Sequence, residues 1–322
     1  MRYLGLDLGG TNVKAAVIEV DGDHRSIVAT ARTETHAHAG PDAVAARMVE
    51  LGEAMRSEHG PLTAVGIGVP GLFDFSEGTI VFFTNLPGAW EGFPLRRRIA
   101  DGLELPATLI NDARAFTLAE AVMGAGEGCR TVACITLGTG VGGGLAIDGQ
   151  LHFGHFGIAG ELGHQTVEPD GRVCGCGNPG CMEAMARPVV VAERAGTETF
   201  EQALAAADAG DATATTAVED AIRYLGIGLA NVVTMFGPER IVIGGGGAEA
   251  GPAFIDRIQQ SVRDRVTLVP RDEVHVVAAT LGSTSGAVGA ALAGVESPAR
   301  DRRFQAGEIP SAAMRRDEIS GE

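Results

Sequence analysis

The chain has 322 residues, 45% of them hydrophobic and 20% charged, a composition that predicts a folded protein of about two domains and excludes general disorder. Its formal net charge of −16 comes from acidic residues spread along the chain, so its surface repels phosphate backbones and nucleic acid is not an expected partner. No apolar stretch is long enough to span a bilayer and no signal peptide is visible, so we expect no membrane partner and a cytoplasmic location.

Strands and helices are predicted to alternate along the chain. Short apolar runs bounded by turn residues predict strands, and apolar residues at helical spacing predict helices. The expected strands are Tyr3–Asp7, Val13–Val20, Ala64–Val69, Thr108–Ile110, Thr131–Leu137, Val141–Ile147, Arg240–Ile243 and Val274–Ala279. The expected helices are Ala43–Glu58, Ala113–Met123, Thr216–Phe236, Pro252–Val266 and Ser285–Ala293. This order predicts an α/β fold in two lobes.

The expected lobes are residues 1–112 and 113–296, with the boundary near Asn111–Arg114. Residues 297–322 are polar, and we expect either a disordered tail or a helix that packs back on the first lobe. The pattern of strand, glycine turn and strand occurs in both lobes, at Leu4–Val17 and again at Cys134–Ala146. Two lobes that each offer a glycine turn can hold a nucleotide between them.

Three glycine-rich segments are candidates for contacts with a nucleotide. In Asp7–Thr11, glycines would let backbone amides approach phosphate oxygens, the Thr11 hydroxyl could donate to them, and Asp7 could hold Mg²⁺ through water. Gly138–Gly140 is the second such turn, and Gly244–Gly247 would let an adenosine ring lie close to the backbone. The spacing is neither that of a Walker A loop nor that of a Rossmann fingerprint. Each segment taken alone could also be an ordinary turn.

Lys14 and the pair Asn111-Asp112 each allow two interpretations. Lys14, the only lysine of the chain, either lies beside nucleotide phosphates or faces solvent. Asn111 and Asp112 stand where a strand meets a helix. As an N-cap, Asp112 would accept hydrogen bonds from the amides of the first helical turn, and the local sequence favours this role. As a general base, it would accept the proton of an attacking hydroxyl.

The strongest local signal is a glycine-rich cysteine cluster. Three of the five cysteines crowd together, which suits a metal site in a reducing compartment better than a disulfide framework. A preceding histidine completes a tetrahedral shell for a structural Zn²⁺. The expected ligands are His164, Cys174, Cys176 and Cys181, with His152 and His155 as rival fourth ligands. Buried cysteines without a metal are the alternative.

Polar residues flank this cysteine knuckle, which we define as Cys174–Cys181. Glu161 and His164 precede it and Glu183 follows it. Side chains anchored to a rigid metal site suit the recognition of a polyol, where paired hydrogen bonds fix each hydroxyl. Carboxylates that are merely solvated are the alternative.

The order of these motifs resembles the ROK family (repressors, open reading frames, kinases), within the fold shared by hexokinase, actin and the heat-shock chaperone ATPases. The resemblance runs from Arg2 to about Ala293. Its most specific part is Glu161-Leu-Gly-His164 followed by Cys174-Gly-Cys176-Gly-Asn-Pro-Gly-Cys181-Met-Glu183. The other motifs, in family order, are Asp7-Leu-Gly-Gly-Thr11, Asn85-Leu-Pro-Gly, Asn111-Asp112, Leu137-Gly-Thr-Gly140 and Ile243-Gly-Gly-Gly246.

The resemblance implies a two-lobed, actin-like (ribonuclease H-like) α/β fold with a structural zinc knuckle. It also implies ATP- and Mg²⁺-dependent phosphorylation of a hexose hydroxyl, with glucose as the leading candidate and Asp112 as the catalytic base. Residues then expected at the sugar are Asn85, Asn111, Asp112, Glu161, His164 and Glu183. Residues expected at ATP and its metal ion are Asp7, Gly10, Thr11, Gly138, Thr139, Gly140 and Gly245. The chain is further expected to form a homodimer or a higher homo-oligomer.

Two departures from the family leave other functions open. Family repressors carry an N-terminal helix-turn-helix, which the residues before the first expected strand are too few to build. Ala89 is inserted between Gly88 and Trp90, in a loop that borders the expected sugar site. Residue spacing does not reveal the contours of the sugar pocket, so mannose, fructose, N-acetylglucosamine and N-acetylmannosamine are alternative sugars. The sequence also leaves polyphosphate open as the phosphate donor. A sugar-sensing regulator without turnover and an ATPase that drives conformational change are the rival classes.

Overall fold

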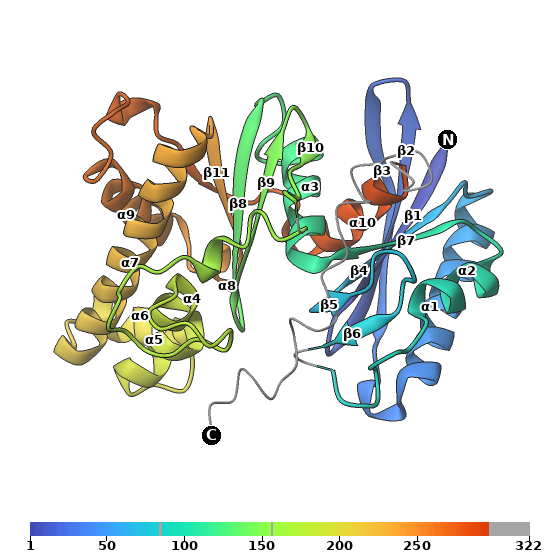
Figure 1. Ribbon diagram of the computed structural model, residues 1–322, viewed down its shortest axis with the longest axis horizontal. Coiled ribbons are helices and arrows are strands. Elements are labelled where there is room, and N and C mark those ends of the chain that lie inside the picture. Colours follow the sequence, from blue (N-terminus) through green and yellow to red (C-terminus); the bar gives the residue numbers. More distant parts are fainter. Residues whose placement is uncertain (84–85, 156, 296–322) are drawn as a thin grey trace. The chain divides into compact units, whose positions relative to one another are not determined.

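The computed structural model describes residues 1–83, 86–155 and 157–295. Its contacts divide these residues into two compact units, the first made of residues 1–124 and 281–295 and the second of residues 125–280. Each unit is built on one five-stranded sheet (Figure 1). Among the described residues, no helix combines the length and the apolarity that crossing a membrane requires. Asn85 and the polar segment 297–322 lie outside the described residues.

The first sheet has the strand order β3-β2-β1-β4-β7. Strands β1, β2 and β3 are antiparallel neighbours, and β4 and β7 then run parallel to β1. Every residue of β4 is buried, as expected of a central parallel strand. The strands are β1 (Arg2–Leu8), β2 (Asn12–Asp21), β3 (His24–Glu34), β4 (Val65–Val69) and β7 (Ala107–Asn111). A small separate sheet pairs β5 (Leu72–Phe73) with β6 (Ile80–Phe82).

The second sheet repeats this arrangement with the order β10-β9-β8-β11-β12. Again three antiparallel strands are followed by two parallel ones. The strands are β8 (Thr131–Leu137), β9 (Val141–Ile147), β10 (Gln150–Leu151), β11 (Arg240–Gly245) and β12 (Val276–Ala278). The two expected occurrences of strand, glycine turn and strand are therefore confirmed as β1-β2 and β8-β9.

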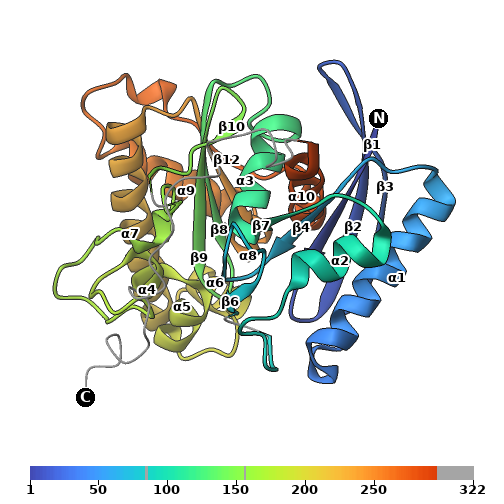
Figure 2. The same ribbon diagram turned by 45° about the vertical axis from the view of Figure 1, so that its right-hand side comes forward.

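Helices cover the sheets of both units. In the first unit they are α1 (Pro41–His59), α2 (Leu95–Leu103), α3 (Asp112–Met123) and α10 (Ser285–Val295). In the second they are α4 (Met182–Ala186), α5 (Pro188–Ala195), α6 (Phe200–Asp208), α7 (Ala212–Phe236), α8 (Gly246–Glu249) and α9 (Pro252–Arg263). The largest core cluster packs the long helix α7 against β8, β9 and β11. Figure 2 shows α4 to α7 and α9 gathered beside the strands of the second sheet.

Every strand and helix predicted from the sequence occurs, with ends shifted by up to four residues. Helix α7 begins earlier than predicted because Asp211 caps it, accepting a hydrogen bond from the Ala214 N–H at 2.8 Å. The additional elements are strands β3, β5, β6 and β10 and helices α2, α4 to α6 and α8. Strand β3 has no buried residue, so it lacks the apolar pattern by which the sequence reveals a strand. Helix α2 carries three consecutive arginines that obscure its apolar face.

The units differ from the expected lobes of residues 1–112 and 113–296, because α3 and α10 both belong to the first unit. Helix α10 lies directly on the first sheet. A Cβ atom at Gly5 of β1 or at Gly66 of β4 would overlap the carbonyl oxygen of Ala287 or Ala290 of α10, respectively. On α10 itself, a Cβ at Gly289 would overlap the Ala115 carbonyl oxygen of α3. Glycines thus allow the backbones of α10, α3 and the sheet to approach closely.

The buried side chain of Glu120 reinforces this packing. Its Oε1 atom accepts hydrogen bonds from the Leu281 N–H at 3.0 Å and the Ser285 hydroxyl at 2.9 Å. This carboxyl oxygen satisfies the two donors at the start of α10, which would otherwise be costly to bury. Glu120 therefore ties α3 to the segment through which the chain re-enters the first unit.

Replacing Gly66 with Ala should lower the free energy of unfolding by about 3 kcal/mol, because the added methyl group meets backbone atoms of α10 that cannot rotate away. Denaturant unfolding followed by circular dichroism measures this loss. Gly138→Ala adds the same methyl group where nothing lies within 4 Å, and should change stability little. Equal effects of the two substitutions would contradict the close packing of α10.

Candidate active site and metal site

The first glycine turn joins β1 to β2 and exposes Gly10 and Thr11. The Gly9 N–H donates to the Asn12 carbonyl at 3.0 Å and closes the turn. The buried residue Thr35 supports it from behind: its hydroxyl donates to the Gly9 carbonyl at 2.6 Å, and its N–H donates to the Thr11 carbonyl at 2.8 Å. No sequence signal indicated this role for Thr35, which follows β3, a strand that the apolar pattern did not predict.

Asp7 stands at the end of β1 beside this turn. Its carboxyl group faces the backbone of two neighbours: a Cβ at Gly286 of α10 would lie 2.5 Å from Oδ2, and one at Gly68 of β4 would lie 3.3 Å from Oδ1. Burial raises the pKa of Asp7, and the positive charge of Lys14, its cross-strand partner, opposes this rise. Lys14 therefore acts on Asp7 electrostatically. A carboxylate beside a glycine turn would suit an outer ligand for Mg²⁺.

The second glycine turn joins β8 to β9 in the other unit. The Gly138 N–H donates to the Gly140 carbonyl at 2.9 Å. Gly245 pairs with Leu137 at the end of β8, so the structure brings Gly138, Thr139, Gly140 and Gly245 to one edge of the second sheet. Gly245 has φ +71°, and a Cβ there would meet the Leu137 carbonyl oxygen at 2.5 Å. Only glycine fits both requirements, and it leaves the backbone accessible to a ligand.

Asn111, and not Asp112, is the N-cap of α3, which corrects the local sequence interpretation. The Asn111 Oδ1 atom accepts from the Ala113 N–H at 3.1 Å and the Arg114 N–H at 3.3 Å. Its Nδ2 donates to the Gly71 carbonyl at 3.3 Å. Asp112 is the exposed first residue of α3, and its Oδ1 accepts from the Ala113 N–H at 2.8 Å. Asn111 therefore makes most of the capping hydrogen bonds that the sequence had suggested for Asp112.

Two of the parallel strands in the first unit, β1 and β7, carry these polar residues at their ends. Asp7 of β1 pairs with Gly68 of β4, and Val69 of β4 pairs with Asn111 of β7. Because the carboxyl ends of parallel strands meet at one edge of a sheet, Asp7, Asn111 and Asp112 share that edge. Ligands of open α/β sheets bind at this edge.

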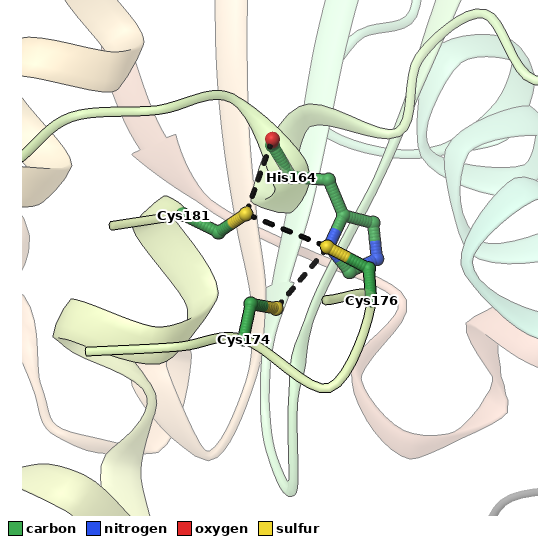
Figure 3. Close-up of side chains that lie close together, drawn as sticks. All are labelled: His164, Cys174, Cys176 and Cys181. Atoms are coloured by element: carbon green, nitrogen blue, oxygen red, sulfur yellow. Dashed lines mark hydrogen bonds between the residues drawn. The ribbon is translucent and has the colours of Figure 1, made fainter. Parts of the chain in front are cut away.

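The cysteine knuckle brings its four expected ligands together (Figure 3). The ligand atoms of His164, Cys174, Cys176 and Cys181 all lie within 4.8 Å of one another. The Cys176 and Cys181 sulfurs are 3.6 Å apart, and the Cys174 sulfur lies 3.6 Å from His164 Nδ1. The rival histidines His152 and His155 are not part of this group among the described residues.

The donor set fits a tetrahedral metal ion. Bond lengths of about 2.3 Å for Zn–S and about 2.0 Å for Zn–N place neighbouring ligands roughly 3.5–3.8 Å apart. The separations of 3.6 Å agree with this geometry. Burial raises the pKa of the Cys174 and Cys181 thiols, so these thiols stay protonated at neutral pH until a metal ion displaces the protons. The site could therefore hold Zn²⁺ with no position left for water.

The knuckle is shaped by its glycines and by Asn178. Cys174 donates its N–H to the Asn178 carbonyl at 2.9 Å, and the Asn178 side chain donates to Thr166 Oγ1 at 2.8 Å and towards Cys181 Sγ at 3.4 Å. Gly180 has φ +67°, and a Cβ there would overlap the Glu168 carbonyl oxygen. Only glycine can adopt this turn, which reverses the chain direction just before Cys181.

The residues expected to bind sugar in the second unit surround the knuckle. Glu161 is exposed, and its carbonyl accepts the N–H of His164 at 3.1 Å. Since Nδ1 of His164 faces Cys174, its Nε2 lies on the opposite side of the ring. Glu183 contacts Cys174 and the Val141 N–H, a link to the second glycine turn that the sequence did not predict. The described site residues are thus grouped within their own units, and Asn85 is outside the description.

Two units of equal strand order, each with a glycine turn and polar strand ends, define a two-unit α/β protein of the actin-like ATPase fold. The sequence model of the ROK family matches residues 3–294. The glucokinase of Streptomyces coelicolor is 35% identical over 311 residues, which cover 89% of this chain and 96% of that enzyme. The chain therefore belongs to the ROK family.

Solved structures agree with this assignment. The ROK hexokinase of Thermus thermophilus is 34% identical with a TM-score of 0.83, over 92% of this chain and 98% of that one. A ROK glucokinase of Streptomyces griseus, solved with glucose and AMPPNP, is 32% identical with a TM-score of 0.74, over 92% of this chain and 100% of that one. A xylose repressor of Caldicellulosiruptor bescii is 30% identical over 222 residues, which cover 63% of this chain and 55% of the repressor.

Replacing Asp7 with Asn should stabilise the protein at neutral pH in the absence of nucleotide and Mg²⁺. Burial raises the pKa of Asp7 in the folded state above its ordinary value of 3.8, so the folded state binds this proton more tightly than the unfolded state. The free energy of unfolding of the wild type therefore falls as the pH rises from 3.8 through the raised pKa of Asp7. At neutral pH the wild type is still less stable by this amount. Asp7→Asn removes this loss of stability. Thermal unfolding at pH 4 to 8 tests this, and a lower midpoint for Asp7→Asn at pH 7 would contradict it.

Proposed function

We propose that this chain is an ATP-dependent hexose kinase that converts glucose to glucose 6-phosphate. Similarity over nearly the full length to glucokinases supports the reaction, and the relative solved with glucose and AMPPNP supports both substrates. The observation that carries the proposal is the pair Asn111 and Asp112. Asn111 caps α3, and Asp112 is exposed at the carboxyl edge of the first sheet, the edge that also carries Asp7 two strands away.

In the proposed reaction, Asp112 accepts the proton of the sugar hydroxyl as the hydroxyl oxygen attacks the γ-phosphorus. A bond forms between that oxygen and phosphorus, the bond from phosphorus to the β,γ-bridging oxygen breaks, and ADP leaves. The backbone amides of the turns at Gly10–Thr11 and Gly138–Gly140 bind phosphate oxygens, and Gly245 lies against the nucleotide. Asp7 would hold Mg²⁺, which would neutralise charge on the phosphates.

The sugar is assigned to Asn85, Asn111, Asp112, Glu161, His164 and Glu183. Carboxylates accept hydrogen bonds from sugar hydroxyls, and His164 presents Nε2 while Nδ1 faces the cysteines. A structural Zn²⁺ would hold His164 in that orientation. Glucose leads because the glucokinases match over almost their whole length, whereas the xylose repressor matches over 55% of its own. A homo-oligomeric assembly and a cytoplasmic location stay predictions.

Replacing Asp112 with Ala should lower kcat by about 10²–10⁴-fold, because the attacking hydroxyl loses its base. Glucose affinity should fall far less than kcat, because the other residues assigned to the sugar remain, and zinc content should stay close to wild type. A coupled ADP-release assay with glucose measures the rate, and calorimetric titration measures glucose binding. Asp101→Ala, which removes an exposed carboxylate from α2, is the matched control and should keep wild-type turnover. Near-normal kcat for Asp112→Ala would refute the base assignment.

Replacing Cys176 with Ala should remove most bound zinc and lower the unfolding midpoint, because a four-ligand shell loses one thiolate. Mass-spectrometric metal analysis of the purified protein gives the zinc content, and calorimetry gives the midpoint. Cys129→Ala, at a cysteine outside the cluster, should retain the metal. Wild-type zinc content in Cys176→Ala would count against the knuckle as a metal site.

A further inference from the structure

Glu183 connects the cysteine knuckle to the second glycine turn. It lies in the first turn of the short helix α4, two residues after Cys181. Its Oε2 atom accepts a hydrogen bond from the Val141 N–H at 2.9 Å, and its Oε1 atom accepts one from Cys174 Sγ at 3.4 Å. One carboxylate therefore contacts both a cysteine of the knuckle and the residue that ends the turn Gly138–Gly140.

Gly140 packs directly against this carboxylate. A Cβ atom at Gly140 would overlap Glu183 Oε2, and no other heavy atom apart from the carboxylate carbon lies close to that position. The φ of Gly140 is not in the left-handed region, so its backbone conformation does not by itself require glycine. The absence of a side chain at Gly140 is explained by Glu183.

The knuckle fixes the backbone from which Glu183 extends. The Met182 N–H donates to the Gln165 carbonyl at 2.9 Å, and Cys181 forms an antiparallel bridge with Thr166. The Arg187 N–H donates to the Glu183 carbonyl at 3.1 Å. Because Glu183 follows a knuckle cysteine so closely in sequence, its position depends on the folded knuckle even without the thiol contact.

We propose that Glu183 is a positioning residue for the nucleotide. By accepting the Val141 N–H, it holds the turn Gly138–Gly140 in the conformation that receives phosphate oxygens, so an ordered knuckle raises the affinity for ATP. A negative charge behind a phosphate-binding turn would by itself weaken binding, so its contribution comes from the hydrogen bond and not from its charge. The inference rests on the proposed function, since it takes this turn to bind nucleotide.

The hydrogen bond and the charge are separable by substitution. Glu183→Ala should weaken ADP binding about tenfold, the effect of losing a hydrogen bond to a charged acceptor. Glu183→Gln keeps an oxygen acceptor without the charge, and should bind ADP as tightly as the wild type or more tightly. Calorimetric titration with ADP in the absence of sugar measures both, at equal zinc content, with zinc added back where a variant has lost it.

Glu193→Ala is the matched control. Glu193 lies on α5 and pairs with Arg172 beside the knuckle, at 3.2 Å. Its removal takes a carboxylate from the surroundings of the knuckle, and should leave ADP affinity at the wild-type value. A tenfold loss in Glu193→Ala as well would show that any change near the knuckle weakens binding, and would overturn the specific role of Glu183.

A double-mutant cycle with Gly140→Ala tests the contact itself. In the wild-type background, the added methyl group collides with Glu183 and should weaken ADP binding. In the Glu183→Ala background that collision is gone, so the same methyl group should have little further effect. An equal loss in both backgrounds would mean that the methyl group blocks phosphate directly, and would contradict the proposed link.

Failure of this inference is distinguishable from failure of the proposed function. If the zinc-loaded Glu183→Ala variant binds ADP as tightly as the wild type, Glu183 does not position the turn for nucleotide. This conclusion holds whether or not the wild-type protein phosphorylates hexoses. A wild-type protein that binds ADP but transfers phosphate to no hexose contradicts the kinase, whatever the Glu183 variants do.

Discussion

The hydrogen-bond register of the parallel strands is the constraint on which the rest of the structure depends. It aligns Asp7, Gly68 and Asn111 at the carboxyl edge of the first sheet, and Leu137 and Gly245 at that of the second. Residues far apart in sequence thereby share an edge, and α10 fixes the first of these edges by lying on glycines of β1 and β4. This arrangement presents carboxylates and backbone amides together at strand ends, where ligands of open α/β sheets bind.

The two sheets repeat one topology but support their glycine turns differently. In the first unit, Thr35 donates its hydroxyl to the Gly9 carbonyl, a neutral contact made from the end of an edge strand. In the second, Glu183 accepts the Val141 N–H from a helix that begins at the cysteine knuckle. A change in the knuckle can therefore reach the second turn, whereas the first turn depends on the local packing of β3.

Signals local in sequence predicted the strand ends, the glycine turns and the clustering of His164 with three cysteines. Buried strands, glycines and close cysteines are visible in a few residues. Longer-range features were hidden. The cap of α3 shifted from Asp112 to Asn111 because the helix starts one residue earlier than expected. Assignment of α10 to the first unit depends on packing between distant segments, and so does the contact of Glu183 with Val141, 42 residues away. Which sugar would be bound depends on the shape of the pocket, which the spacing of residues in the sequence does not reveal.

The central claim, transfer of phosphate from ATP to a hexose, is tested most directly by measuring ADP release by the wild-type protein with each of a panel of hexoses and N-acetylhexosamines. We predict ADP release that requires sugar, is fastest with glucose and yields one hexose phosphate for each ADP. ADP release at the same rate without sugar, or none with any sugar of the panel, would contradict it.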